Sequence, residues 1–132
     1  MEGVFMSFFE GFLNFINSCG SLPQKADLNG FNKSNAAVFI DGGKAEFFED
    51  ISEGGLFSLP FRILIRIKPK DNSEKLKIYE TFNNIMLYFL ENQFDYNGIC
   101  CRITPSGCAA LNERYNDGTE EYSQSFNLFY YK

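Results

Sequence analysis

The sequence predicts an α+β domain: a mostly antiparallel sheet with a long helix packed on one face and an amphipathic helix at the N-terminus. Residues 56–68 alternate apolar and polar side chains with a period of two, which is typical of a half-buried strand. Residues 72–92 follow almost directly and repeat apolar side chains with the period of a helix. A helix packed on such a strand builds a two-layer domain, and 132 residues suffice for one domain over residues 1–132.

The strand at 56–68 is expected to turn one apolar face inward and one polar face outward. The inward face is predicted to hold Phe57, Leu59, Phe61, Ile63, Ile65 and Ile67, and the outward face Ser58, Arg62, Arg66 and Lys68. Pro60 has no backbone N–H to donate. It therefore predicts an edge position, a bulge, or a strand that starts near Phe61.

The long helix carries a start signal, because Asp71 is a suitable N-cap and Glu74 completes a capping box three residues later. Its apolar stripe is predicted to cover the inward face of the strand. That predicted stripe consists of Leu76, Tyr79, Phe82, Ile85, Met86, Phe89 and Leu90.

The first eighteen residues space their apolar side chains three and four apart, which predicts an amphipathic helix with an aromatic stripe. Glu2 stands where a signal peptide carries Lys or Arg, so we do not expect a signal peptide. No stretch approaches the roughly 20 apolar residues that cross a bilayer. We expect Gly20 to end the helix as a left-handed cap.

The other segments predict shorter strands joined by turns. We expect strands at 36–40, 45–50, 99–104 and 121–131, a continuation at 109–111 after a bulge, and one short strand within 22–34. Tight turns are expected at 41–43, 95–98 and 116–118.

The four cysteines are expected to be free and mostly buried, in a reducing cytoplasm. They are Cys19, Cys100, Cys101 and Cys108, and they form no CxxC pair. Histidine is absent. Zinc-finger and redox spacings therefore both fail.

The sequence contains no group of residues that indicates catalysis. Without histidine, Ser-His and Cys-His nucleophile pairs are excluded. The Gly-Gly pairs at 42–43 and 54–55 match no phosphate-loop spacing. We therefore predict no catalytic, cofactor or metal site and do not expect an enzyme.

The charge is acidic overall, at −5, but it is unevenly distributed. Six of the twelve basic residues lie within 62–77, and acidic residues gather before them and near the C-terminus. An acidic chain argues against general nucleic-acid binding. Two interpretations of the clusters stay open: solvated faces, or complementary patches that dock head to tail between identical subunits.

Three passages, in this order along the chain, carry a family resemblance. They are Val-Phe-Ile-Asp-Gly-Gly at 38–43, the strand at 59–66 with the helix at 74–90, and the passage at 114–128 with its Glu-Tyr-Ser. In this layout the chain resembles the small tail terminator proteins of long-tailed bacteriophages and phage-tail-like particles, often labelled minor capsid or tail-completion proteins. The chain departs from the pattern in its Phe-rich first helix and in the small residues at 107–110.

The resemblance implies a structural protein that forms a ring, usually a hexamer, on the head-proximal end of the tail tube. The ring ends growth of the tube, and of a sheath if present, and offers a docking surface to the head connector. The implied partners are further copies of the chain, the tube protein, and sheath and head-connector proteins. Nucleic-acid sequence recognition and membrane binding are not implied. The implied location is a virion or phage-tail-like particle, assembled in the bacterial cytoplasm.

Our interface hypothesis places the basic strand face of one subunit against an acidic segment of its neighbour. The residues are Arg62, Arg66 and Lys68 on one side, and Glu46, Glu49 and Asp50, with Phe47 and Phe48, on the other. The alternative for the arginines is that they only solvate an exposed sheet face. The alternatives for the protein are a head–tail joining or other tail assembly component, or a cytoplasmic adaptor domain that binds a ligand or peptide.

Overall fold

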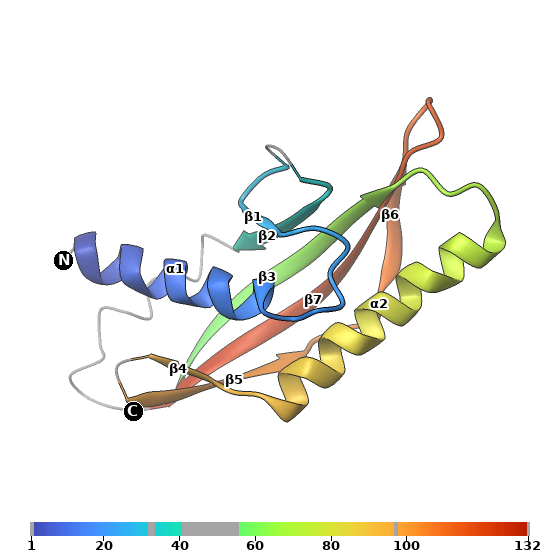
Figure 1. Cartoon of the computed structure of the whole chain (residues 1–132). Helices are drawn as coiled ribbons and strands as arrows, with labels where there is room; N and C mark the ends of the chain where they lie inside the picture. Colours follow the sequence, from blue (N-terminus) through green and yellow to red (C-terminus); the bar gives the residue numbers. More distant parts are fainter. Residues whose placement is uncertain (1, 32–33, 41–55, 97, 132) are drawn as a thin grey trace.

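A computed structural model describes residues 2–31, 34–40, 56–96 and 98–131 (Figure 1). The elements are α1 (Glu2–Asn17), β1 (Asp27–Leu28), β2 (Ala36–Ile40), β3 (Leu56–Ile67), α2 (Asn72–Glu91), β4 (Phe94–Tyr96), β5 (Ile99–Pro105), β6 (Ala110–Arg114) and β7 (Glu120–Tyr131). Both helices pack against the same face of a curled sheet, so the α+β class predicted from the sequence is confirmed. The predicted turn at 41–43 and strand at 45–50 lie outside the described residues.

The sheet runs in the order β1-β2-β3-β7-β5-β4, and β6 also pairs with β7. The prediction of a mostly antiparallel sheet is corrected to a mixed one, because β1 runs parallel to β2. The other described pairings are antiparallel. The longest of them joins β3 to β7 from Leu56↔Tyr131 to Ile67↔Glu120, so these two strands form the middle of the sheet.

Strand β6 continues β5 along the same edge of β7. Pro105 pairs with Phe126 and Ala110 pairs with Ser123, so five steps along one strand oppose three along the other. The extra residues form the irregularity that the sequence predicted as a bulge. The β6–β7 hairpin closes at Gly118, whose φ of +92° suits the predicted turn at 116–118.

Pro60 lies inside β3, where its missing donor costs little. The N–H of Arg66 donates to Asn35 O on the β2 side at 2.8 Å, and successive strand residues point to alternate sides. The nitrogen of Pro60, six residues earlier, therefore also faces the β2 side. The described β2 ladder has already ended there, at Ile40↔Phe61. Of the alternatives the sequence left open, the local edge position fits best.

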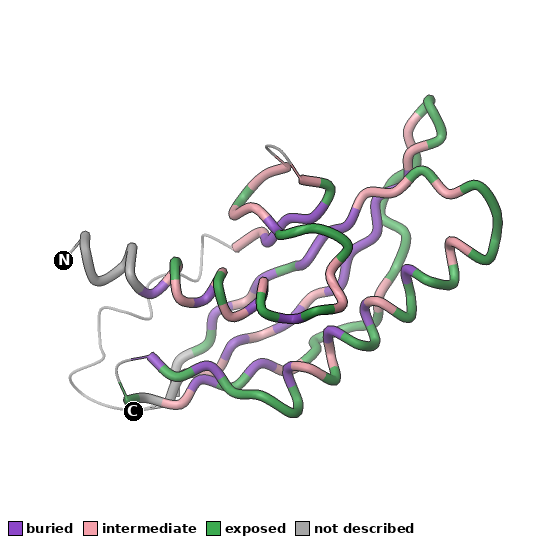
Figure 2. Tube along the Cα trace, viewed as in Figure 1, coloured by how far each residue is buried: buried purple, intermediate pink, exposed green. Residues whose placement is uncertain are grey.

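The core lies between the helices and one face of the sheet (Figure 2). The side chains of Leu59, Phe61, Ile63 and Ile65 on β3 are at most 1% exposed, as the alternation predicted. Phe61 contacts Phe12 of α1, with ring centroids 4.9 Å apart, and Phe126 of β7 at 5.5 Å. This aromatic cluster joins both helices to the central strands.

The start of α2 is confirmed, and its predicted stripe is partly wrong. Glu74 N donates to Asp71 Oδ1 at 3.0 Å, and Glu74 Oε1 accepts from Lys70 N at 2.8 Å. The side chains that α2 buries are Ile78, Phe82, Ile85 and Phe89, while Leu76, Tyr79 and Leu90 are 64%, 42% and 61% exposed. Apolar residues cover more of the circumference of α2 than the sheet can contact, so periodicity alone misplaced the centre of the stripe.

Two loop predictions need correction. Gly20 does not adopt a positive φ; instead, Asn17 holds the end of α1 to the next segment, since its side chain donates to Ala26 O and accepts from Ala26 N. The predicted turn at 95–98 is shorter, because Asp95 belongs to β4 and the positive φ is at Gly98. None of the four cysteines forms a disulfide: Cys19 and Cys101 are buried, Cys100 is half-buried, and Cys108 is exposed.

Candidate functional site

The face of the sheet opposite the helices, which we call the open face, holds the predicted interface arginines. Among the described residues no helix covers it. Phe39 of β2, Arg62 of β3 and Ser125 of β7 are direct neighbours across the strands. Because strand residues alternate between faces, these three side chains point away from buried Phe61 and Phe126.

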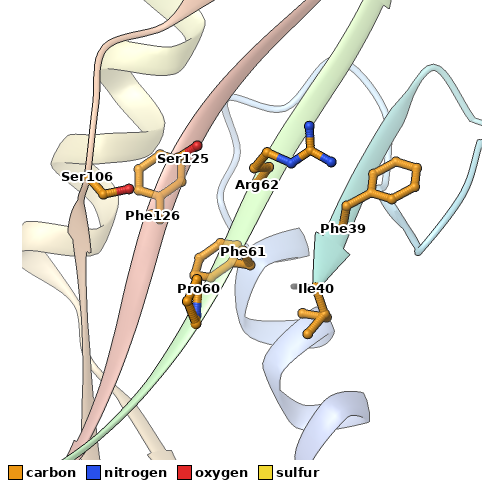
Figure 3. A pocket seen from close by; sticks show the side chains of 8 residues that line it. All are labelled: Phe39, Ile40, Pro60, Phe61, Arg62, Ser106, Ser125 and Phe126. Atoms are coloured by element: carbon orange, nitrogen blue, oxygen red, sulfur yellow. The ribbon is translucent and has the colours of Figure 1, made fainter. Parts of the chain in front are cut away.

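A groove of about 530 Å³ surrounds this row of side chains (Figure 3). It is lined by Phe39, Ile40, Pro60, Phe61, Arg62, Ser106, Ser125 and Phe126. Arg62 is exposed, and its Cζ lies 5.9 Å from the centroid of the Phe39 ring. None of the ion pairs in the described part of the chain includes Arg62. A guanidinium held over an aromatic ring, with no carboxylate among the described residues bound to it, is suited to bind an acidic group.

Arg66, two positions further along the same strand face, is bound within the chain. Its Nε lies 3.2 Å from Glu121 Oε1, and its Nη2 donates to Tyr115 Oη at 3.2 Å. The guanidinium lies 4.0 Å from the centroid of the Phe31 ring and 5.3 Å from that of Tyr115. The carboxylate and both rings therefore bind Arg66 within its own chain, although its side chain is still 37% exposed.

Two apolar residues connect the surroundings of the two arginines. Leu64 lies between them on β3 and is 4% exposed, and its neighbour Ala37 on β2 is fully buried. The Phe31 and Phe39 rings, one beside each arginine, lie 6.0 Å apart. The open face is therefore a packed aromatic surface with Arg62 at one end.

The other predicted basic residue, Lys68, lies beside the β6–β7 turn. A Cβ placed on Gly118 would be 3.4 Å from Lys68 Cε. A hydrogen bond from Thr119 N lowers the pKa of the Asp117 carboxyl below its usual range, and the nearby Lys68 charge lowers it further. Lys68 thus contributes to the turn, away from the groove around Arg62.

A charged cluster on the helix-covered side holds α2 to the last hairpin. Glu120 is 3% exposed, and it accepts from Tyr122 Oη at 2.6 Å and from Arg114 Nε at 2.7 Å, while Lys75 Nζ of α2 lies 3.8 Å away. These contacts lower the pKa of Glu120, whereas burial and the bond to Glu120 raise the pKa of Tyr122 to about 12. Both carboxylate oxygens have partners within the chain, so this cluster stabilises the packing of α2 on the sheet.

The structure describes only part of the predicted interface. Arg62 and Arg66 lie on the strand face where the alternation placed them, whereas Lys68 lies beyond the end of β3 at Ile67; of the three, Arg66 alone forms an ion pair among the described residues. The predicted opposite side, Glu46, Phe47, Phe48, Glu49 and Asp50, lies outside the described residues. The sequence interpretation missed Phe31, Phe39, Tyr115 and Glu121, which surround the arginines. For Phe39 the signal was present, because it occupies the outward position of a predicted strand.

The described residues contain no group of three or more Cys, Asp or Glu residues placed to hold a metal ion. Neither described helix is long and apolar enough to cross a membrane.

Comparison with models of protein families finds no match to this sequence, and comparison with curated proteins finds none either.

Proposed function

We propose that this protein is a tail terminator, a structural protein that forms a hexameric ring on the head-proximal end of a phage tail tube. In this proposal the ring ends polymerisation of the tube, and of a sheath where one exists, and offers a docking surface to the head connector. Its place is a virion or phage-tail-like particle assembled in the bacterial cytoplasm. Its work depends on shape and contact rather than on catalysis.

The observation that carries the proposal is the one-sided architecture. Both helices pack on one face of the sheet, and the open face presents Arg62 over Phe39 beside a groove. A closed ring needs head-to-tail contacts, in which two different surfaces of each subunit meet. A two-layer domain with a helical outer surface and an aromatic, basic sheet surface supplies two such different surfaces.

Arg62 is the charged residue that we assign to the contact between subunits. A charge at the rim of an interface steers association and fixes register more than it adds affinity. The sequence hypothesis gives its acidic partner as Glu46, Glu49 and Asp50 of the neighbour, which lie outside the described residues. Arg66 and Lys68 support the surface from within their own subunit.

The test combines the purified protein with polymerising tube protein and measures tube lengths by negative-stain electron microscopy. The proposal expects short, capped tubes with the native protein and longer tubes with Arg62→Glu. Lys25→Glu makes the same charge change at an exposed position outside the groove and is the matched control. Tubes that grow equally long with and without the native protein would contradict the proposal.

One observation favours a second candidate function, a ligand- or peptide-binding adaptor domain. The groove beside Arg62 has a volume within the range of small-molecule sites, which is roughly 300–1,000 Å³. Its guanidinium, aromatic ring and two serine side chains are suited to a carboxylate group. This candidate predicts a monomer of 15.1 kDa that binds an acidic peptide and loses the binding in Arg62→Ala, with no effect on tube length.

A further inference from the structure

Helix α2 carries a second apolar surface that the fold does not use. Leu76, Tyr79, Leu87 and Leu90 are 64%, 42%, 42% and 61% exposed, and we call them the outer stripe. At 3.6 residues per turn they lie within about 80° of one another around the helix axis. The face that packs on the sheet is made of other residues, Ile78, Phe82, Ile85 and Phe89.

Such a surface is unusual on a helix at the outside of a domain. The exposed side of an amphipathic helix normally carries charged and polar residues. Single exposed apolar residues are common, but a row of large ones along one helix indicates a surface for interaction. The outer stripe spans about 21 Å from Leu76 to Leu90, at 1.5 Å per residue.

A groove between α2 and the connection from β5 to β6 widens this surface. Its volume is about 370 Å³, and Tyr79, Met86, Pro105, Cys108 and Ala109 are among its lining residues. Most of its exposed lining is apolar. The outer stripe therefore continues sideways from the helix toward the edge of the sheet.

We infer that the outer stripe binds a second copy of this chain, by packing against the open face of its sheet. This inference rests on the proposed ring and names the two surfaces that meet in it. The helices cover one face of the sheet, so the outer stripe and the open face lie on opposite sides of one subunit and meet only between copies.

The exposed charges beside the outer stripe and on the open face indicate which surface the stripe binds. Glu80 and Glu91 flank the outer stripe on α2, both are exposed, and neither belongs to an ion pair in the described part of the chain. Arg62 and Arg102 are exposed basic residues of the open face, since Arg102 and Ser58 both pair with Phe129, and neither arginine belongs to an ion pair in the described part of the chain. A stripe with carboxylates along one side fits a face that carries guanidinium groups, so in this inference Glu80 and Glu91 take the place that the sequence hypothesis gave to Glu46, Glu49 and Asp50.

The experiment measures self-association of the full chain by analytical ultracentrifugation and native mass spectrometry. Leu87→Lys and Leu90→Lys are each expected to weaken self-association about tenfold or more, since a central apolar contact contributes at least 1.4 kcal/mol, the equivalent of tenfold. Asn14→Lys adds the same charge at an exposed position of α1, away from both proposed surfaces, and is expected to have little effect. Because all three positions are exposed, an unchanged circular dichroism spectrum is expected for each variant.

A charge exchange tests the pairing itself. Arg62→Glu and Glu80→Lys should each weaken the oligomer, and the double variant should recover at least part of the loss. Two outcomes would overturn the inference: an oligomer that Leu87→Lys and Leu90→Lys leave intact, or a dimer that depends on the stripe but not on Arg62.

Tube length is measured in parallel. If the stripe variants leave the ring and the capping of tubes unchanged, the inference fails and the proposed function stands. If the native protein self-associates through the stripe without limiting tube length, the proposed function fails and the inference stands.

Discussion

Two consecutive residues of α2 give a direct test of how this helix packs. Phe89 is 4% exposed and its ring meets those of Phe126, Phe61 and Phe15, at centroid distances of 5.1, 6.4 and 6.1 Å. Leu90, the next residue, is 61% exposed. Phe89→Ala is expected to destabilise the fold strongly, and Leu90→Ala to leave its stability almost unchanged.

The magnitude follows from the packing. Removal of a fully packed Phe leaves a cavity and costs about 3–5 kcal/mol. A domain of this size has about 5–15 kcal/mol of stability, so Phe89→Ala removes a large part of it. Substitution of an exposed side chain changes stability by about 0.5 kcal/mol or less.

The assay is urea unfolding, followed by circular dichroism at a concentration where the chain is monomeric. With a urea dependence of about 2 kcal/mol per M, a loss of about 4 kcal/mol moves the midpoint down by about 2 M. Leu90→Ala should shift it by about 0.25 M or less. Equal shifts in the two variants would refute the packing of α2 described here, because they would place both side chains in the core.

Three further predictions concern single groups. Arg66→Ala should destabilise the monomer, because it leaves Glu121 without its cation, whereas Arg62→Ala should leave the urea midpoint unchanged and weaken only self-association. The fold lowers the pKa of Glu120 from 4.5, so ionised Glu120 stabilises the folded state above pH 4.5. This stabilisation is lost as the pH falls through the folded-state pKa. Glu120→Gln should therefore be less stable than the native protein at pH 7 and lose less stability on acidification. A thermal denaturation series from pH 7 to pH 3 measures this, and parallel curves for both proteins would contradict it. Gly118→Ala should cost about 1–2 kcal/mol because of its positive φ, while Gly107→Ala, where the φ is not positive, should be nearly neutral; equal unfolding midpoints would count against the turn geometry.

Local sequence signals predicted the elements that depend on neighbouring residues. The cap of α2 was predicted because Asp71 and Glu74 act within one helical turn. The inward face of β3 was predicted because alternation alone decides which side chains share a face. The β6–β7 turn was predicted from Asn-Asp-Gly, and Gly118 takes the expected positive φ.

The parts that the sequence did not predict depend on distant residues. Arg66 meets Glu121 because β3 pairs with β7 in the register Arg66↔Glu121, and nothing within either strand specifies that pairing. Phe31 belongs to a polar segment, so its contact with Arg66 followed only once that loop was placed beside β3. The inner side of α2 was misplaced since Leu76 and Leu90 are as apolar as the residues that it buries.

Exposed groups without a described partner and charged groups satisfied within the chain have different places in the proposed function. Two surfaces assigned to subunit contact, the outer stripe and the groove beside Arg62, consist of residues that a purely internal role does not explain. By contrast, the most elaborate charged contacts, those of Arg66 and Glu120, are satisfied within the chain. The proposed interface therefore rests on surface charges without a described partner rather than on the density of charge along the sequence.

The measurement that tests the central claim most directly is the native mass of the protein, alone and after release from tube ends. A ring of six 15.1 kDa chains predicts a species of about 91 kDa that Arg62→Glu weakens and Lys25→Glu does not. A protein that remains a 15.1 kDa monomer in the presence of tube ends, and leaves tube length unchanged, would contradict the account.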